Sequence, residues 1–261
     1  MALSKIQSES VNLADDFAFT GTVTGTTPLI ASEFKTHNNT LFYADFSESG
    51  AISGTNIQNL ATGTSAVSKV LPLDGYTTST ERGNTVISVG SDKQGLRTSL
   101  TGDEFDITNN GMTMGVLFKK VKADNTTDGG LIYYGDTGTD NHFFVRLDFN
   151  AATKIYIGED TGSSDVWTDS GFTYNQNKFG FFAVSIDTNG TMMAHLDNVT
   201  NQIRANGTVP TPTSAVFGIG GDPYNDNASN HTYASFFFYK GVATKAQINK
   251  EIEYLQSKWI F

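Results

Sequence analysis

Short runs in which apolar and polar side chains alternate dominate the chain, which is the pattern of half-buried β-strands. In residues 112–118, every second residue from Met112 to Phe118 is large and apolar. A similar run, 181–186, leads through the turn 187–190 into residues 192–197. That turn contains Asn-Gly, which favours a hairpin because both residues tolerate positive φ. Such runs predict roughly a dozen strands, enough for two stacked antiparallel sheets.

The spacing of the apolar residues changes from that of a strand to that of a helix near the end of the chain. Thr244 and Gln247 stand at the spacing of a capping box, in which the two side chains satisfy backbone N–H groups at a helix start. The apolar side chains that follow recur at helical spacing and form one stripe: Ile248, Ile252, Leu255 and Trp259. We therefore expect a C-terminal helix that lays this stripe on a sheet and turns Asn249, Lys250, Glu253 and Lys258 toward solvent.

The first 34 residues form a different kind of segment. Residues 17–27 are rich in Gly and Thr and are strand-like, but they carry few large side chains. Such a strand cannot build a core by itself, so it must pair with its own domain, with sister chains or with a scaffold. The alternative is a flexible tail. We divide the chain into an attachment or oligomerisation segment, 1–34, and a sandwich domain, 35–261.

Composition narrows the functional classes. The 261 residues contain 17 Lys plus Arg against 27 Asp plus Glu, a net charge of −10, which argues against a nucleic-acid partner. The absence of Cys excludes disulfides, thiolate metal sites and cysteine nucleophiles. No stretch approaches the roughly 18 apolar residues of a membrane helix, and the first residues lack the apolar region of a secretory signal. We therefore expect neither a membrane-spanning segment nor secretion of the protein.

Several short motifs follow one another in a set order: 41–47 with 57–63, 112–119, 178–187, 193–198, 217–221 and 234–248. Together they resemble the concanavalin-A-like jelly roll, in its laminin-G-like and pentraxin-like branch. Phe179 stands where that family usually has Trp, and Asn198 where it has Gly. The resemblance implies an all-β fold: a two-sheet antiparallel jelly-roll sandwich with a C-terminal α-helix. It implies a lectin-like domain without specifying the ligand.

The first 26 residues open with Met-Ala-Leu-x-Lys and continue into the repeat-like strand FTGTVTG at 19–25. This resembles the N-terminal segments of tailed-bacteriophage fibre and other virion appendage proteins. The resemblance implies a virion location, with host cytoplasm during assembly, and contact with other virion proteins through residues 1–34. Appendage proteins of this kind are commonly trimeric, so it also implies a homotrimer.

Catalytic residues are hard to find in this sequence. Glycoside hydrolysis needs two carboxylates held on one face at a defined separation, and no strand carries that spacing. The densest acidic clusters, Glu159-Asp160 and residues 103–106, are expected in solvated turns. The four His show no metal or nucleophile spacing, and His195 is expected on the solvent face of a strand. We therefore expect no catalytic site.

The strongest candidate for a binding site is the loop 221–230, between two strand signals. It supplies carboxylates, amides and one aromatic ring, which are the groups that bind sugar hydroxyls and the apolar face of a sugar ring. Hard oxygen ligands also suit Ca²⁺, the one cofactor that the sequence leaves open. The alternative is an ordinary polar turn. The candidate ligand-binding residues of this loop are Asp222, Tyr224, Asn225, Asp226 and Asn227.

Two further candidates lie elsewhere. Trp167 stands among small polar residues in 160–171, where it is either a stacking platform for a ligand or a plug at the edge of the sandwich. Asp136 and Asp140 either share a cation or cap a turn.

The expected function is that of a non-enzymatic virion protein, a fibre, knob or decoration subunit that presents a lectin-like domain to a host surface or glycan. One alternative is a free bacterial carbohydrate-binding module or adhesin. The other is a polysaccharide-degrading jelly-roll enzyme, whose activity would depend on Glu159 or Asp160.

Overall fold

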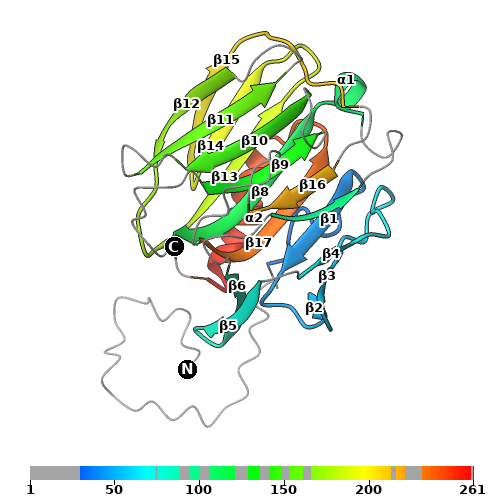
Figure 1. The fold of residues 1–261 in the computed structure, drawn as a ribbon, viewed down its shortest axis with the longest axis vertical. Helices are drawn as coiled ribbons and strands as arrows, with labels where there is room; N and C mark the ends of the chain where they lie inside the picture. Colours follow the sequence, from blue (N-terminus) through cyan, green and yellow to red (C-terminus); the bar gives the residue numbers. More distant parts are fainter. Residues whose placement is uncertain are drawn as a thin grey trace, which may run out of the picture.

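A computed structural model describes residues 30–73, 76–88, 95–99, 106–120, 129–135, 141–147, 153–160, 166–212, 216–220, 231–259 and 261. Two antiparallel sheets are stacked face to face, and one helix lies on the outer face of the larger sheet (Figure 1). The predicted all-β sandwich with a C-terminal helix is confirmed. No helix within these ranges has the length and hydrophobicity needed to span a bilayer.

The larger sheet has eight strands in the order β15-β14-β13-β8-β17-β6-β5, and β1 also pairs with β17. The strands are β15 (Val199–Arg204), β14 (Met192–Leu196), β13 (Phe179–Ile186), β8 (Met112–Lys120), β17 (His231–Lys240), β6 (Asn84–Ser88), β5 (Thr77–Glu81) and β1 (Thr40–Asp45).

The second sheet has six strands in the order β12-β11-β10-β9-β16-β7. They are β12 (Val166–Thr173), β11 (Lys154–Asp160), β10 (His142–Leu147), β9 (Gly129–Gly135), β16 (Val216–Ile219) and β7 (Leu96–Ser99). A small third sheet contains β2 (Ile52–Ser53), β3 (Asn56–Gln58) and β4 (Val70–Pro72), and a short helix α1 covers Ile107–Asn110.

The alternation in residues 112–118 becomes the two faces of β8. Met112, Met114, Val116 and Phe118 all face the core between the two sheets. Leu117 points the other way and joins the layer under the C-terminal helix. The predicted hairpin is also present, because β13 and β14 pair antiparallel on either side of the turn 187–190. Burial of each large apolar side chain contributes about 1.5–3 kcal/mol, so this strand is a major part of the core.

The C-terminal helix α2 (Lys245–Gln256) forms as the sequence predicts. Thr244 and Gln247 make both contacts of the capping box. The stripe from Ile248 to Trp259 is buried on the outer face of the eight-stranded sheet. Lys250 and Glu253 are exposed as expected, but Lys258 is only partly exposed because its ammonium group turns back to Asp45.

Residues 30–34 are the described part of the predicted N-terminal segment, and together with residue 35 they run across α2 and the eight-stranded sheet. The Phe34 ring is buried and stacks on Phe237, with ring centroids 3.9 Å apart and an interplanar angle of 12°. Gly115 provides room for this stack, since a Cβ there would overlap the Phe237 ring. Residues 1–29 lie outside the described residues, so the segment 1–34 stays a prediction as a unit.

Candidate functional site

The predicted ligand residues Asp222, Tyr224, Asn225, Asp226 and Asn227 lie outside the described residues, as do the candidate cation ligands Asp136 and Asp140. The strand ends that flank these segments are described. In the β16–β9 pair, Val216 lies opposite Gly135, whereas Ile219 lies opposite Ile132. The segment after Gly135 and the segment after Gly220 therefore leave the six-stranded sheet at opposite ends.

Trp167, the remaining predicted site residue, lies on the outer face of the six-stranded sheet. Cross-strand pairing places it in a row that crosses five strands. The row runs through Gly218, Tyr133, Phe144, Gly158 and Trp167. The two glycines leave space for the neighbouring rings. A Cβ at Gly158 would overlap Phe144, and one at Gly218 would lie 2.9 Å from the Tyr133 ring. We call these five residues, together with Arg146 of β10, the aromatic row.

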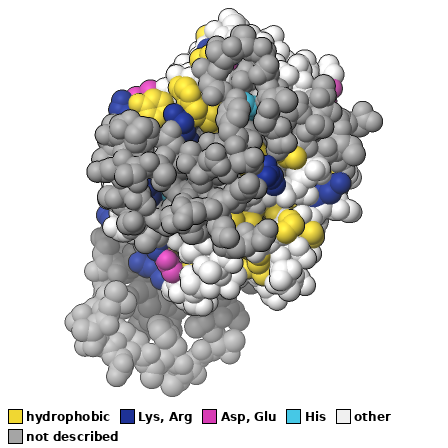
Figure 2. Space-filling model, viewed as in Figure 1, with side chains coloured by type: hydrophobic (Ala, Val, Ile, Leu, Met, Phe, Trp, Pro, Cys, Tyr) yellow, Lys and Arg dark blue, Asp and Glu magenta, His cyan; other side chains and the backbone are white. Residues whose placement is uncertain are grey.

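The indole of Trp167 contacts two side chains of β10. The Phe144 ring meets it at 84°, with centroids 4.6 Å apart. The guanidinium carbon of Arg146 lies 3.2 Å from the ring centroid, a stacked cation–π contact. Such a contact contributes about 0.5–2 kcal/mol, depending on exposure. Trp167 keeps a partly exposed surface, and Figure 2 shows hydrophobic side chains next to Lys or Arg side chains on this face of the molecule.

This arrangement offers an apolar ring next to planar hydrogen-bond donors. It places Trp167 outside the space between the two sheets, so the tryptophan is not part of the main core. Its role in ligand binding stays a prediction.

The expectation for Glu159 is wrong. The sequence suggested a solvated turn, but Glu159 belongs to β11 and its side chain is only 6% exposed. It lies opposite Phe143, a core residue, and the alternation of the strand turns it inward. There it forms an ion pair with Arg204 of β15, whose Nε and Nη2 also donate to the carbonyls of Gly190 (3.0 Å) and Thr208 (3.2 Å). The pair therefore links the two sheets. The Asp160 side chain lies outside the described residues.

His195 also differs from its expectation. Its side chain is buried on β14, with Nδ1 2.9 Å from Thr200 Oγ1. Burial, with a smaller contribution from the charge of Lys245, lowers the pKa of His195 to about 4. The residue is therefore neutral at pH 7. Asp106 behaves as a turn residue, because its carboxylate accepts from Asn109 N at 3.1 Å and caps α1.

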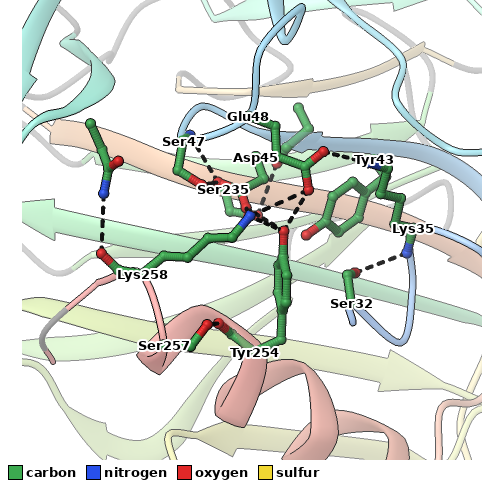
Figure 3. A network of polar contacts seen from close by, with 12 residues as sticks. Ser32, Lys35, Tyr43, Asp45, Ser47, Glu48, Ser235, Tyr254, Ser257 and Lys258 are labelled. Carbon is green, nitrogen blue, oxygen red and sulfur yellow. Dashed lines mark hydrogen bonds and ion pairs between the residues drawn. The ribbon is translucent and has the colours of Figure 1, made fainter. Parts of the chain in front are cut away.

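The densest polar cluster of the described residues was not found from the sequence. It joins β1 and the loop after it to the end of α2 (Figure 3). Asp45 Oδ2 accepts from Tyr254 OH at 2.9 Å and from Lys258 Nζ at 3.0 Å. Its Oδ1 accepts from Ser47 N at 2.9 Å and from Ser47 Oγ at 2.7 Å. Glu48 binds Tyr254, Lys258 and Lys35. We call Asp45, Glu48, Tyr254, Lys258 and Lys35 the clamp cluster.

The clamp cluster is satisfied internally. Each oxygen of the two carboxylates already has a partner within the cluster or in Ser47. Burial opposes the ionisation of Glu48, but hydrogen bonds from Lys35 and Tyr254 outweigh it and lower its pKa. Burial and the neighbouring Asp45 carboxylate raise the pKa of Tyr254, which stays protonated and donates. The arrangement therefore fastens a helix to a sheet and leaves no carboxylate oxygen unengaged for a substrate.

Comparison with known proteins shows which solved structures have a similar fold. No protein-family model and no curated protein matches the sequence. Among solved structures, Trypanosoma rangeli sialidase in complex with sialic acid matches with a TM-score of 0.59 at 11% identity, over 84% of this chain and 33% of that chain. The binding domain of botulinum neurotoxin serotype D matches with a TM-score of 0.51 at 11% identity, over 83% of this chain and 52% of that chain.

The chain thus spans about a third of the sialidase and about half of the toxin domain. At these identities the likeness concerns the fold. The protein is a two-sheet antiparallel β-sandwich, which is the fold that the resemblance to the jelly-roll family implied.

Proposed function

We propose that the protein is a non-enzymatic virion subunit, a fibre, knob or decoration protein, whose sandwich binds a cell-surface glycan through the outer face of the six-stranded sheet. The observation that carries the proposal is the contact between Trp167 and Arg146. Sugars present an apolar ring face and several hydroxyls, so a partly exposed indole beside a guanidinium group matches both parts of the ligand.

The proposed site lies on a rigid support. Trp167, Phe144 and Tyr133 belong to three strands of one sheet, and the glycines between them let the rings pack closely. The segments after Gly135 and after Asp160 leave the sheet at the same end, because His142 pairs with both residues. Rigid sheets that position loops are the usual support of recognition sites. The similar structures support only the glycan-binding part of this proposal, since one is a sialidase in complex with sialic acid and the other a toxin binding domain.

The non-enzymatic part of the proposal rests on how the described carboxylates are engaged. Glu159, one of the two carboxylates on which the enzymatic alternative depends, is paired with Arg204. Asp169, near Trp167 on β12, is paired with Lys154 at 2.6 Å. A general acid or nucleophile needs access to its substrate, and both groups are occupied by a cation.

The virion part of the proposal rests on the sequence resemblance of residues 1–26. Under it, residues 1–34 contact other virion proteins, and the chain forms a homotrimer. The structure adds that residues 32–34 are fastened to the sandwich, so a force on the attachment segment would reach α2 directly.

A glycan array tests the binding function with the full chain. We expect binding to a restricted set of glycans and a loss of at least tenfold in affinity for Trp167→Ala. The matched control is Val166→Ala, which removes an exposed side chain from the neighbouring position of the same strand. Equal loss in both variants, or no binding to any glycan, would reject the aromatic row as the site.

Two further measurements separate the alternatives. Release of reducing ends from a bound glycan would favour the enzyme. Antibody labelling of virions tests the location, and glycan binding without label on any virion would favour the free bacterial adhesin.

A further inference from the structure

Another buried carboxylate, Glu251, lies at the centre of the contact between residues 30–35 and the sandwich. It belongs to α2 but is fully buried. Three donors converge on it: Ser32 Oγ at 2.7 Å and Phe34 N at 3.3 Å on one oxygen, and Tyr43 OH at 2.9 Å on the other. Two of these donors belong to residues 30–35, which we call the strap, and the third belongs to β1.

No cation balances this carboxylate among the groups that the structure describes. The ammonium groups of Lys35 and Lys258 are engaged by the clamp cluster. The charged group that acts on Glu251 is Asp45, a second carboxylate, while Tyr43 faces it as a neutral donor. The hydrophobic cluster under α2 includes Phe34, Leu117 and Phe237. An ionised Glu251 is therefore stabilised by hydrogen bonds alone.

The neutral acid makes the same contacts without the charge. When Oε2 is protonated it donates to Ser32 Oγ, which then accepts this hydrogen bond and the one from Lys35 N at 3.0 Å, while the Ser32 hydroxyl proton no longer points to Glu251. The Phe34 N–H still has a lone pair on that oxygen, and Tyr43 OH still donates to the other oxygen. The protonated and ionised forms thus hold the strap through the same atoms, but only the ionised form bears the cost of a buried, unbalanced charge.

We propose that Glu251 is a proton-operated latch, which holds the strap on α2 when it is protonated and loosens it when it loses its proton. The latch would control how firmly the segment before residue 30 is fastened to the sandwich. The proposal concerns the strap alone and does not depend on a glycan or a virion. Burial is the main cause that raises the pKa of Glu251 to about 7, above its ordinary 4.5, and the three hydrogen bonds oppose it.

The direction of the effect follows from this pKa. A carboxyl whose pKa is higher in the closed state than in the open state stabilises the closed state at low pH, and this stabilisation is lost as pH rises through the closed-state value. Opening of the strap should therefore be constant below about pH 4.5 and increase by up to about tenfold per pH unit between about pH 4.5 and 7. Above about pH 7 it should level off, because Glu251 is then ionised in both the closed and the open state.

Hydrogen exchange on the full chain tests the latch, with rates corrected for the intrinsic pH dependence of exchange. For the wild type, we expect the protection of amides in residues 32–35 to fall by up to about tenfold per pH unit between about pH 4.5 and 7, and to level off above pH 7. At every pH this protection should stay below that of β13, which reports opening of the whole sheet. Equal protection in the two regions would show that the strap does not open separately and would overturn the proposal.

Two variants test whether the Glu251 carboxyl itself causes the pH dependence of strap protection. Glu251→Gln is neutral at every pH, so strap protection should become independent of pH; a wild-type slope in this variant would overturn the latch. The matched control is Glu253→Gln, which removes an exposed charge from the same helix and should keep the wild-type slope.

If Glu251→Gln does not fold, Tyr43→Phe gives an independent answer. It removes one donor that favours the ionised carboxylate, so the midpoint of the pH dependence should move upward. An unchanged midpoint would overturn the proposal.

Discussion

Asp45 and Tyr254 are 209 positions apart in the sequence, yet the Asp45 carboxylate accepts a hydrogen bond from the Tyr254 hydroxyl at 2.9 Å. Asp45 ends β1, and Tyr254 is on the last turn of α2, so this bond joins the first strand of the sandwich to the final helix. Both side chains are buried, which makes the contact expensive to leave unmade.

The first prediction concerns this bond. Tyr254→Phe removes the hydroxyl that both Asp45 and Glu48 bind. It keeps the aromatic ring that packs in the hydrophobic layer between α2 and the sheet. Because hydrogen bonds to charged groups contribute about 1.5–3 kcal/mol, we expect a loss of that size in the free energy of unfolding. Urea denaturation measures it.

Tyr156→Phe is the control, since this partly exposed tyrosine makes no described side-chain hydrogen bond. It should change stability by less than about 0.5 kcal/mol. Similar losses in both variants would show that the clamp cluster does not fasten the helix.

The second prediction concerns the link between the sheets. Glu159→Gln leaves the Arg204 guanidinium without its carboxylate. Breaking a fully buried pair costs about 3–5 kcal/mol; the Arg204 side chain is 23% exposed and reaches water, so we expect about 1–3 kcal/mol.

A double-mutant cycle with Arg204→Met isolates the interaction. The coupling energy should exceed about 0.5 kcal/mol, as for groups in direct contact. A coupling near zero would mean that the stability loss comes from elsewhere. The same variants should bind glycan as the wild type does, because the pair faces the space between the sheets.

The third prediction concerns the stability of the fold at acidic pH. His195 has a pKa of about 4 in the fold against 6.5 ordinarily, because burial disfavours its charged form. Between these values the unfolded chain binds more protons than the folded chain, so stability falls as pH drops from 6.5 toward 4. At about 1.4 kcal/mol per pKa unit, the loss is at most about 3.5 kcal/mol.

Chemical denaturation at several pH values measures this dependence. His195→Gln should flatten it in that window, whereas His37→Gln, at a partly exposed position, should not. If His195→Gln leaves the pH dependence of the unfolding free energy unchanged, groups other than His195 cause the sensitivity to acid.

The fourth prediction concerns the glycines of the aromatic row. Gly158→Ala places a Cβ where the Phe144 ring lies. Since overpacking a close contact costs about 1–3 kcal/mol, we expect a loss in that range, with weaker glycan binding because Phe144 supports Trp167.

Gly180→Ala is the matched control on another strand. Its Cβ would meet only Leu196, at 3.9 Å, which is an ordinary contact. The comparison therefore separates the loss of a glycine from the overlap with a ring, and equal effects of the two variants would contradict the prediction.

Much of the fold could be predicted from local pattern. The alternation from Met112 to Phe118 defined both faces of β8, and the stripe from Ile248 to Trp259 defined the buried side of α2. The capping box at Thr244 is also local, since it involves residues three positions apart. Glu251 carried a signal that could have been used, because it lies three residues after Ile248, and so within the buried stripe.

The candidate site was less predictable. Trp167 was named, but its partners Phe144 and Arg146 come from a neighbouring segment of the sheet, and only strand register brings them together. Glu159 was placed in a turn because Asp160 and Gly162 follow it. Instead, Glu159 lies opposite the core residue Phe143 in the paired strands, so its carboxylate points inward.

The sequence by itself determined the strand period, the hairpins, the helix and its cap, because each depends on neighbours within a few positions. Only the tertiary structure decided that Asp45 meets Tyr254, that Glu251 meets the strap and that Glu159 meets Arg204. The reason is physical. A carboxylate is stable beside water or beside a buried donor, and which of the two it meets depends on how distant segments pack, on which the local pattern carries no information.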